Sequence, residues 1–300
     1  MKDIILISNR ESGRMKKVFL IGADGMLGGE LKERLEKKYE VVGTTIETLD
    51  ICDKEAVLTK AKEVKPYFII NCAAFTNVDA CEVKEELALS VNGTALENIA
   101  EAAKQENATL IHISTDYVFA GNKPVEEVYT EDMEPNPVSA YGRTKLVGEN
   151  NAKKAEKYYI LRTAWLYGLG GKNFVKTMLK LSQDKDEISV VDDQHGSPTS
   201  TTTLCEIIEK IMEKEPEYGI YHSTNEGFTT WCKFTRKIFE FANINTKVKA
   251  ITSKEYKEMY PQSSDRPTNS QLSKEKLKNV GIVPANWEDA LKDYLKEELK

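Results

Sequence analysis

Near the start of the chain, the stretch Val18-Phe19-Leu20-Ile21-Gly22-Ala23-Asp24-Gly25-Met26-Leu27-Gly28 joins an uninterrupted apolar run to three glycines. Four consecutive apolar residues are typical of a parallel strand that is covered on both faces. The residues that follow, with Leu31 and Leu35 four apart, predict an amphipathic helix. Glycines between a strand and a helix let the backbone approach a pyrophosphate, whose charge then lies at the helix N-terminus. The stretch therefore predicts a dinucleotide-binding turn, and the alternative is an ordinary glycine turn without a ligand.

Further apolar runs follow at intervals that leave room for helices between them. They lie at residues 40–44, 67–70, 110–113 and 158–162, and a closing strand is expected at 219–222. Strands that alternate with amphipathic helices form parallel sheets with helices on both faces. We therefore expect the α/β class, with a Rossmann-type doubly wound parallel sheet and a smaller, interleaved α+β substrate domain.

The end of the second expected strand leaves the choice of nucleotide open. An NAD enzyme often has an acidic residue there to hold the ribose hydroxyls, and an NADP enzyme often has an arginine nearby. Thr44, Thr45 and Ile46 are neither, and Glu47 comes slightly late. The pattern therefore decides for neither nucleotide; we expect a small preference for NADPH, with NADH also possible.

A hydroxyl, a phenol and an ammonium group follow in an order that suits carbonyl reduction. Thr115 comes at the end of the strand at 110–113, and Tyr141 and Lys145 are four apart on one face of a helix that begins near Val138. An ammonium beside a phenol lowers the phenol's pKa, and a phenol tuned in this way can donate a proton to a carbonyl oxygen. A solvated helix face is the common alternative for the Tyr-x-x-x-Lys pair alone.

Composition excludes several other classes of protein. The 300 residues carry a net charge of -6, whereas a nucleic-acid-binding chain normally has a basic face. The longest apolar runs fall far short of the ~20 residues of a membrane span, so we expect a cytoplasmic protein without a membrane or nucleic-acid partner. The five cysteines lack a Cys-x-x-Cys spacing, which fits reduced thiols. The three histidines have no ligand spacing, and His112 between two isoleucines is expected to be a core residue.

With these motifs identified, the chain resembles the dTDP-4-dehydrorhamnose reductases, a family of the extended short-chain dehydrogenases. The spacing of Gly22, Gly25 and Gly28 is similar to theirs, and the resemblance covers about residues 16–300. Its most specific parts are Ser114-Thr115-Asp116-Tyr117-Val118-Phe119, Arg162-Thr163-Ala164-Trp165-Leu166-Tyr167-Gly168, Asp193-Gln194-His195-Gly196-Ser197-Pro198-Thr199 and Arg266-Pro267.

The resemblance implies a role for each matching position. The catalytic set would be Thr115, Tyr141 and Lys145. The residues around the cofactor would be Gly22, Gly25, Met26, Leu27, Gly28, Asp50, Ile51, Ala73, Ala74 and Thr76, together with Tyr141 and Lys145. The residues around the sugar nucleotide would be Val78, Thr115, Asp116, Tyr117, Trp165 and Arg266, with Arg266 on the pyrophosphate.

Some relatives bind magnesium through acidic side chains at a dimer contact. Glu30 and Glu297 fall near such positions, but Thr202 stands where another acid would be expected. We therefore predict no metal, and the oligomeric state stays open between a monomer and a homodimer.

The expected organisation has three parts. Residues 1–14 would be an N-terminal extension, residues 15–167 and 197–227 the NAD(P)-binding domain, and residues 168–196 and 228–300 the substrate domain. Helices are expected at 173–181, 204–212, 231–241, 253–259 and 273–277, a short strand at 188–191, and the lysines between 247 and 300 on a solvated face.

The expected activity is the reduction of dTDP-4-dehydro-L-rhamnose to dTDP-L-rhamnose by NAD(P)H. One alternative is another sugar-nucleotide enzyme of the superfamily, an epimerase or a dehydratase. Such dehydratases have an Asp-Glu pair after the threonine, but here Asp116 is followed by Tyr117. A second alternative is a non-catalytic NADP-binding regulatory subunit, which the presence of Thr115, Tyr141 and Lys145 disfavours.

Overall fold

The structure is a computed structural model, and it describes residues 10–11 and 14–300. The expected N-terminal extension therefore lies mostly outside the described residues. Within it, the short strand β1 (Arg10–Glu11) pairs antiparallel with β2 (Arg14–Met15), directly before the first strand of the main sheet.

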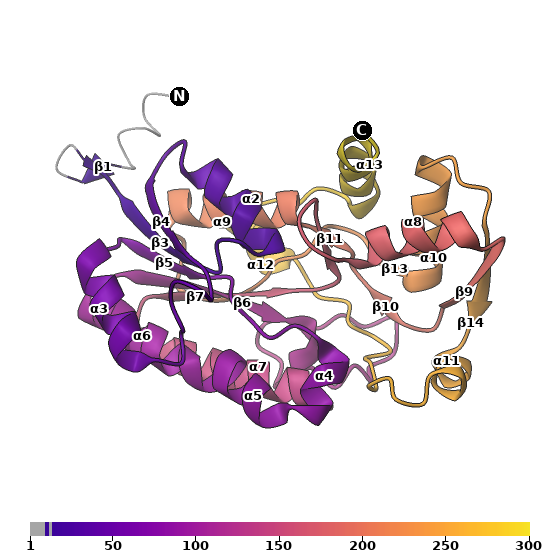
Figure 1. Ribbon diagram of the computed structural model, residues 1–300, viewed down its shortest axis with the longest axis horizontal. Coiled ribbons are helices and arrows are strands. Elements are labelled where there is room, and N and C mark those ends of the chain that lie inside the picture. The colour runs from indigo at the N-terminus through magenta and orange to yellow at the C-terminus, as the bar shows by residue number, and fades with distance from the viewer. Residues whose placement is uncertain (1–9, 12–13) are drawn as a thin grey trace.

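A six-stranded sheet forms the centre of the molecule (Figure 1). Its spatial order is β12-β7-β6-β5-β3-β4, and every neighbouring pair is parallel. The strands are β3 (Lys17–Ile21), β4 (Glu40–Thr44), β5 (Phe68–Asn71), β6 (Thr109–Thr115), β7 (Tyr158–Thr163) and β12 (Gly219–His222). The predicted Rossmann-type parallel sheet is confirmed.

Helices cover both faces of this sheet, which explains the uninterrupted apolar run in β3. Val18 and Leu20 pack against one helical layer, and Phe19 and Ile21 pack against the other. The first layer contains α2 (Met26–Leu35), α9 (Thr201–Lys214) and α12 (Glu275–Asn279), and the second contains α3 (Lys54–Val64), α6 (Ala95–Gln105) and α7 (Ala140–Ala152). Both faces of the strand are therefore buried, and neither can be polar.

The chain reverses its direction of travel across the sheet between β3 and β5. From β3 it passes to the edge strand β4, and it then returns to β5 on the other side of β3. In open α/β sheets, ligands bind in the crevice at the carboxyl ends of the strands at such a switch point. The glycine turn after β3 and the small residues after β5 both lie at this point.

The helical segment between β5 and β6 has a wide turn in its middle. After α4 (Val78–Val83), the chain forms α5 (Glu85–Leu89), a π-helical turn η1 (Ser90–Thr94) and then α6. Such π-turns are often found at functional sites. This one carries Asn92 into the interior, where its side chain is fully buried.

A second group of elements lies beyond the carboxyl ends of the strands (Figure 1). Its elements are α8 (Phe174–Asp184), β9 (Glu187–Val191), α10 (Trp231–Phe241), β14 (Lys247–Ile251), α11 (Ser253–Met259) and α13 (Trp287–Glu298). β9 and β14 form a parallel pair, and α8, α10 and α13 share a core around Phe234. β14 and α13 were not predicted from the sequence.

Short pairings connect the two groups of elements. β8 (Leu166–Tyr167) runs parallel to β11 (Thr199–Ser200), and β10 (His195–Gly196) runs antiparallel to β13 (Thr229–Thr230). One-turn 3-10 helices, η2 (Asp116–Val118) and η3 (Lys153–Ala155), follow β6 and α7.

The expectation that the lysines between 247 and 300 form a solvated face is wrong for Lys274. This side chain is 3% exposed, and its Nζ lies 3.9 Å from the centre of the Phe228 ring. Burial lowers the pKa of Lys274 to about 8. Among the described residues, no helix is long and apolar enough to cross a membrane.

Candidate active site

The glycine turn after β3 is shaped by two close approaches of the backbone. Gly22 has a φ of +77°, and a Cβ on it would lie 2.8 Å from the backbone nitrogen of Ala73. A Cβ on Gly28 would lie 2.0 Å from the carbonyl oxygen of Gly22. The N-cap of α2 is Gly25, which has no side chain to occupy the N–H groups of the first turn at Met26 and Leu27. The turn therefore leaves the positive end of a helix open, as an anionic ligand requires.

The small residues after β5 are held in place by hydrogen bonds to the π-helical turn η1. Asn92 accepts a hydrogen bond from the Phe75 nitrogen at 2.8 Å and donates one to the Phe75 oxygen at 3.0 Å. These two bonds fix the backbone beside Ala73 and Ala74, which are partly exposed, while Thr76 is exposed. Asn92 was not among the predicted site residues, although an asparagine within a helix was a signal.

Asp50 and Ile51 lie between β4 and α3, on the β4 side of the crevice. The Asp50 side chain is exposed and its Oδ1 accepts a hydrogen bond from the Cys52 nitrogen at 2.9 Å. Ile51 is buried, and its carbonyl oxygen accepts from Asn98 at 3.0 Å.

The structure brings Thr115, Tyr141 and Lys145 to the same edge of the sheet. α7 begins after Ser139, whose hydroxyl caps the helix by accepting a hydrogen bond from the Gly142 nitrogen at 3.1 Å. The Tyr141 hydroxyl contacts the Thr115 side chain at the end of β6. The ring of Tyr117 packs edge-on against the Tyr141 ring, with 5.5 Å between the centroids.

The expectation that Lys145 lowers the pKa of Tyr141 is wrong in this geometry. Lys145 is 2% exposed, and its Nζ donates to the Ile113 carbonyl oxygen at 2.6 Å. Burial raises the pKa of Tyr141, the nearby Asp116 raises it further, and the contact with Thr115 lowers it in part. Burial also lowers the pKa of Lys145 to about 8, against an opposing effect of Glu149 and Cys72. The phenol is therefore held in its protonated form.

Asp116 is the buried acid of the site. It is 2% exposed, and its Oδ1 accepts a hydrogen bond from the Thr115 hydroxyl at 2.9 Å. Burial raises the pKa of Asp116 to about 6, although hydrogen bonds from Ser270 and Thr115 oppose this. A carboxylate next to the Thr115 hydroxyl and the Tyr141 phenol therefore gives the site a negative charge at neutral pH.

Two buried polar groups behind Lys145 were missed as parts of the site. His112 is fully buried, as expected of a core residue, but its ring also lies between Asn71 and Lys145. Glu149 accepts hydrogen bonds from Ser114 at 2.6 Å and from Arg162, twice, at 2.8 Å. The recurrence of Tyr141, Lys145 and Glu149 at intervals of four was the signal in the sequence.

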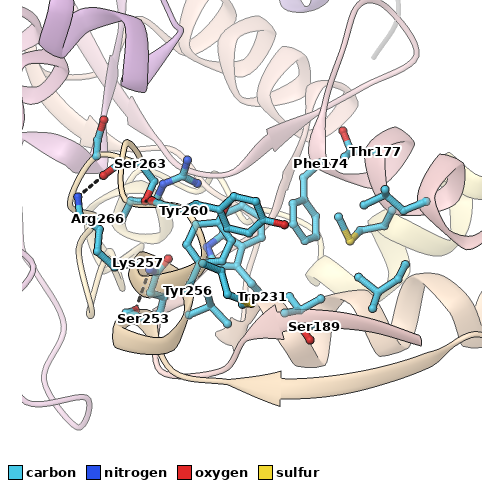
Figure 2. Close-up of a pocket in the computed structure, with 18 of the residues that line it drawn as sticks. Phe174, Thr177, Ser189, Trp231, Ser253, Tyr256, Lys257, Tyr260, Ser263 and Arg266 are labelled. Atoms are coloured by element: carbon cyan, nitrogen blue, oxygen red, sulfur yellow. Dashed lines mark hydrogen bonds between the residues drawn. The ribbon is translucent and has the colours of Figure 1, made fainter. Parts of the chain in front are cut away.

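A pocket of about 670 Å³ lies between α8, β9, α11 and the segment 259–266. Figure 2 shows Tyr260, Trp231 and Phe174 gathered along it, with Arg266 towards one end. Trp165, which has a φ of +49°, stacks on Trp231 with 3.6 Å between ring centroids. Flat aromatic faces of this kind suit a nucleobase or a sugar ring.

Arg266 connects this pocket with the strand ends. Its Nη2 lies 3.7 Å from the Asp79 carboxylate, and Asp79 also accepts hydrogen bonds from the nitrogen and hydroxyl of Ser264 at 2.8 Å. Val78, at the start of α4, is next to this contact and partly exposed. Burial raises the pKa of Tyr117, and the charge of Arg266 opposes this, so the guanidinium lies near the Tyr117–Tyr141 pair.

A glycine turn at the switch point of a parallel sheet, followed by a threonine at a strand end and a Tyr-x-x-x-Lys helix, defines an NAD(P)-dependent oxidoreductase of the short-chain dehydrogenase type. The model of the RmlD substrate binding domain matches residues 15–300. The spore coat polysaccharide biosynthesis protein SpsK of Bacillus subtilis is 39% identical, over 94% of this chain and 98% of its own.

The dTDP-4-dehydrorhamnose reductase of Aggregatibacter actinomycetemcomitans is 39% identical, over 93% of this chain and 98% of its own. The dTDP-4-dehydrorhamnose reductase of Bacillus anthracis, whose structure was solved in complex with NADP, superposes with a TM-score of 0.89 at 38% identity, covering 94% of this chain and 99% of that one. The chain belongs to the RmlD family of dTDP-4-dehydrorhamnose reductases.

Proposed function

We propose that this chain reduces dTDP-4-dehydro-L-rhamnose to dTDP-L-rhamnose with NADPH. The observation that carries the proposal is the position of Tyr141, at the strand ends between the glycine turn and the aromatic pocket that Arg266 borders. A carbonyl group there would have a proton donor on one side and a nucleotide-sized pocket on the other. The family to which the chain belongs supports the same substrate class.

The residues around the crevice fit a dinucleotide. The approach of Gly22 to Ala73 leaves no room for a side chain, and the open start of α2 offers N–H groups to a pyrophosphate. Met26, Leu27, Gly25 and Gly28 would line the pyrophosphate, Asp50 and Ile51 the adenosine, and Ala73, Ala74 and Thr76 the path to the nicotinamide. When bound, NADPH supplies the hydride.

Tyr141 would act as the general acid. As C4 of the sugar accepts the hydride, the phenol O–H bond breaks, its proton goes to the carbonyl oxygen and an alcohol is formed. The phenolate then regains a proton from water. The raised pKa of Tyr141 keeps the proton in place until charge develops on the substrate oxygen. The single O–H of Thr115, which donates to Asp116 in this structure, would turn from that carboxylate to donate to the substrate oxygen. Lys145 would hold the ribose.

The substrate would lie across the two groups of elements. Arg266 would pair with the pyrophosphate through its planar fork, and Trp165 and Tyr117 would contact the sugar nucleotide together with Val78 and Asp116.

The domain division that follows is an NAD(P)-binding domain of residues 15–167 and 197–227 and a substrate domain of residues 168–196 and 228–300. α12, within the second range, nevertheless packs under the sheet.

Dehydration of the sugar is disfavoured by one feature of the site. A dehydratase would have an acid directly after Asp116, whereas the aromatic Tyr117 occupies that position and packs on Tyr141. Reduction needs only one proton donor, which Tyr141 supplies.

The test is turnover of dTDP-4-dehydro-L-rhamnose, followed by the loss of NADPH absorbance and by identification of the product sugar. We expect one NADPH consumed per dTDP-L-rhamnose formed, with no reaction of dTDP-glucose, which lacks the keto group. The C4 configuration is read from proton couplings, which separate rhamnose from its C4 epimer. If no keto-sugar nucleotide is turned over while NADPH still binds, the chain is a binding subunit instead.

A further inference from the structure

A buried row of three polar side chains runs from the end of β5 to the catalytic lysine. Asn71 and His112 face each other in the register of β5 and β6, and Asn71 Nδ2 lies 3.2 Å from His112 Nδ1. His112 Nε2 lies 3.4 Å from Lys145 Nζ. All three side chains are at most 2% exposed, so water does not compete for these contacts.

The backbone N–H of Ala73 determines which atoms of this row donate a hydrogen bond and which accept one. Its N–H donates to the Asn71 side chain at 3.2 Å, so the atom that it meets must be the amide oxygen. The Asn71 NH2 group therefore points at His112 Nδ1, which must accept a hydrogen bond and carry no proton. In neutral imidazole the proton is then on Nε2, the nitrogen that faces Lys145. Burial lowers the pKa of His112 and keeps the ring neutral, and any charge on Lys145 acts in the same direction.

Lys145 consequently faces an N–H group and not an acceptor. An ammonium has three N–H bonds and no lone pair, so it cannot bond to a second donor. An amine can accept the His112 proton on its lone pair while it donates to the Ile113 carbonyl, 2.6 Å away. The surroundings therefore favour the amine form of Lys145 before any ligand is bound.

The charged and titratable groups around Lys145 do not reverse this preference. Cys72, at the end of β5, is neutral because burial raises the pKa of its thiol to about 12. Glu149, on α7 itself, favours the ammonium, but its oxygens are shared with Arg162 of β7 and Ser114 of β6. Burial outweighs the opposing effects of Glu149 and Cys72, and the pKa of Lys145 falls to about 8.

We propose that His112 is a positioning residue that stabilises the amine form of Lys145 in the free enzyme, so that NADPH binding takes up a proton. The phosphates of NADPH bring negative charge, and the ribose hydroxyls offer acceptors that only an ammonium can fully supply with N–H bonds. Lys145 then gains a proton as the cofactor binds. Because this proposal rests on the NADPH site proposed above, its test must separate binding from proton uptake.

Isothermal titration calorimetry with NADPH makes this separation. The observed heat in buffers of different ionisation enthalpy gives the number of protons exchanged, and the same titration gives the affinity. For the wild type at pH 8 we expect uptake of roughly half a proton per NADPH, because a group with a pKa of about 8 is half deprotonated there. The cofactor's 2′-phosphate, with a pKa of about 6, is already ionised and adds little.

Two substitutions at position 112 distinguish the contact of the ring with Lys145 from its contact with Asn71. In His112→Gln, the longer amide reaches the Nε2 position and can turn its oxygen to Lys145, which favours the ammonium. Uptake should fall to roughly a tenth of a proton, and the alkaline limb of kcat/KM should move to higher pH. In His112→Asn, the shorter amide keeps a partner for Asn71 but does not reach Lys145, so uptake should be intermediate. Ile111→Val, on the same strand, is the control and should match the wild type.

A purely structural role for His112 would lower the melting temperature and the rate equally at every pH, with proton uptake unchanged. That outcome, or NADPH binding by the wild type without proton uptake, overturns the proposal. If NADPH does not bind at all, the proposed function itself fails. Should the variants not fold, nitrogen-15 NMR of histidine-labelled wild type decides: a neutral ring protonated on Nε2 that shifts on NADPH addition supports the proposal, and one protonated on Nδ1 contradicts it.

Discussion

The strand ends and the aromatic pocket are built in opposite ways. At the strand ends, Thr115, Asp116 and Lys145 are at most 5% exposed and hydrogen-bonded to neighbours in the protein. In the pocket, large aromatic rings line about 670 Å³ of open space, and Tyr260 is 55% exposed. The first region has fixed polar atoms and little room, and the second has room and few fixed polar atoms.

This difference follows from what each region must do. Proton and hydride transfer require reacting atoms within about 0.5 Å of a productive position, which groups on strands and helices can maintain. Recognition of a nucleotide needs contact area and a few charges, and aromatic faces provide these without fixing each atom. Substitutions at the strand ends should therefore change kcat, and substitutions at the pocket should change KM.

The largest effect is expected for Tyr141→Phe. Loss of the general acid should lower kcat by roughly 10²–10⁴-fold, while the affinity for NADPH stays the same. Single-turnover kinetics and calorimetry measure the two quantities. Phenylalanine keeps the ring that packs on Tyr117, so a loss of stability is not expected. An unchanged kcat would remove Tyr141 from the mechanism and leave the strand ends without a proton donor.

The next effect concerns stability at the strand ends, and Asp116→Asn tests it. The pKa of Asp116 is raised from 3.8 to about 6, so the native state holds its proton more tightly than the unfolded state. The protonated carboxyl therefore adds to the free energy of unfolding below pH 4. This contribution, about 3 kcal/mol at most, is lost as the pH rises through about 6. An asparagine keeps an acceptor for Thr115 without the charge.

We therefore expect Asp116→Asn to melt several degrees higher than the wild type at pH 7.5, with roughly a third of that difference left at pH 4.5, and with reduced turnover. Thermal unfolding at the two pH values measures this. Asp184→Asn, at the exposed end of α8, should shift the melting temperature at neither pH. A variant that is less stable at pH 7.5 would mean that the carboxylate is stabilised by contacts that outweigh its burial.

The sequence predicted the strand ends far better than the pocket, and the reason is topological. A parallel sheet brings the residues after each strand to one edge, so the glycines, Ala73 and Thr115 could be grouped from the order of the strands alone. Asn92 was given no role and His112 was assigned only to the core, because their partners Phe75 and Lys145 come from other elements. Tertiary contacts of this kind leave no periodic signal.

The pocket draws its walls from several segments that no motif connects. Phe174, Trp231 and Tyr260 come from α8, α10 and the segment after α11, and β14 forms behind them from a lysine-rich sequence that did not predict a strand. Arg266 and Trp165 were found through the resemblance to a family, and not through any pattern of their own. Their placement in the fold required the structure.

The prediction that substitutions at the pocket change KM is tested by Arg266→Met. This substitution keeps the length of the side chain and removes its charge. Loss of charge-assisted bonds to a pyrophosphate, at about 1.5–3 kcal/mol, should lower kcat/KM by roughly 10–100-fold, mostly through KM. NADPH affinity should not change. Arg236→Met on α10, an exposed arginine away from the pocket, is the control. An equal loss of kcat with an unchanged KM would place Arg266 among the catalytic groups.

The smallest effect concerns the choice between NADPH and NADH at the end of β4. The Thr44 carbonyl accepts hydrogen bonds from Gly22 and Ala23 at 2.9 Å, which brings the glycine turn against this strand end. The hydroxyls of Thr44 and Thr45 have no hydrogen-bond partner among the described residues. Both hydroxyl oxygens are buried and would have to turn outward to donate to a 2′-phosphate, and such bonds are weaker than those from an arginine. We therefore expect NADPH to be preferred by less than about 1.4 kcal/mol, which is tenfold in binding.

Thr45→Asp should reverse this preference, because a carboxylate repels the 2′-phosphate and accepts hydrogen bonds from the ribose hydroxyls of NADH. The use of NADH should stay largely unchanged, and kcat/KM with both cofactors, before and after the change, measures the effect. Glu47→Gln, two residues further along and exposed, is the matched control and should leave the preference as it is. A wild type that prefers NADH, or a Thr45→Asp variant that still prefers NADPH, would mean that another residue contacts the ribose and sets the preference. A changed preference in Glu47→Gln would identify Glu47 as that residue.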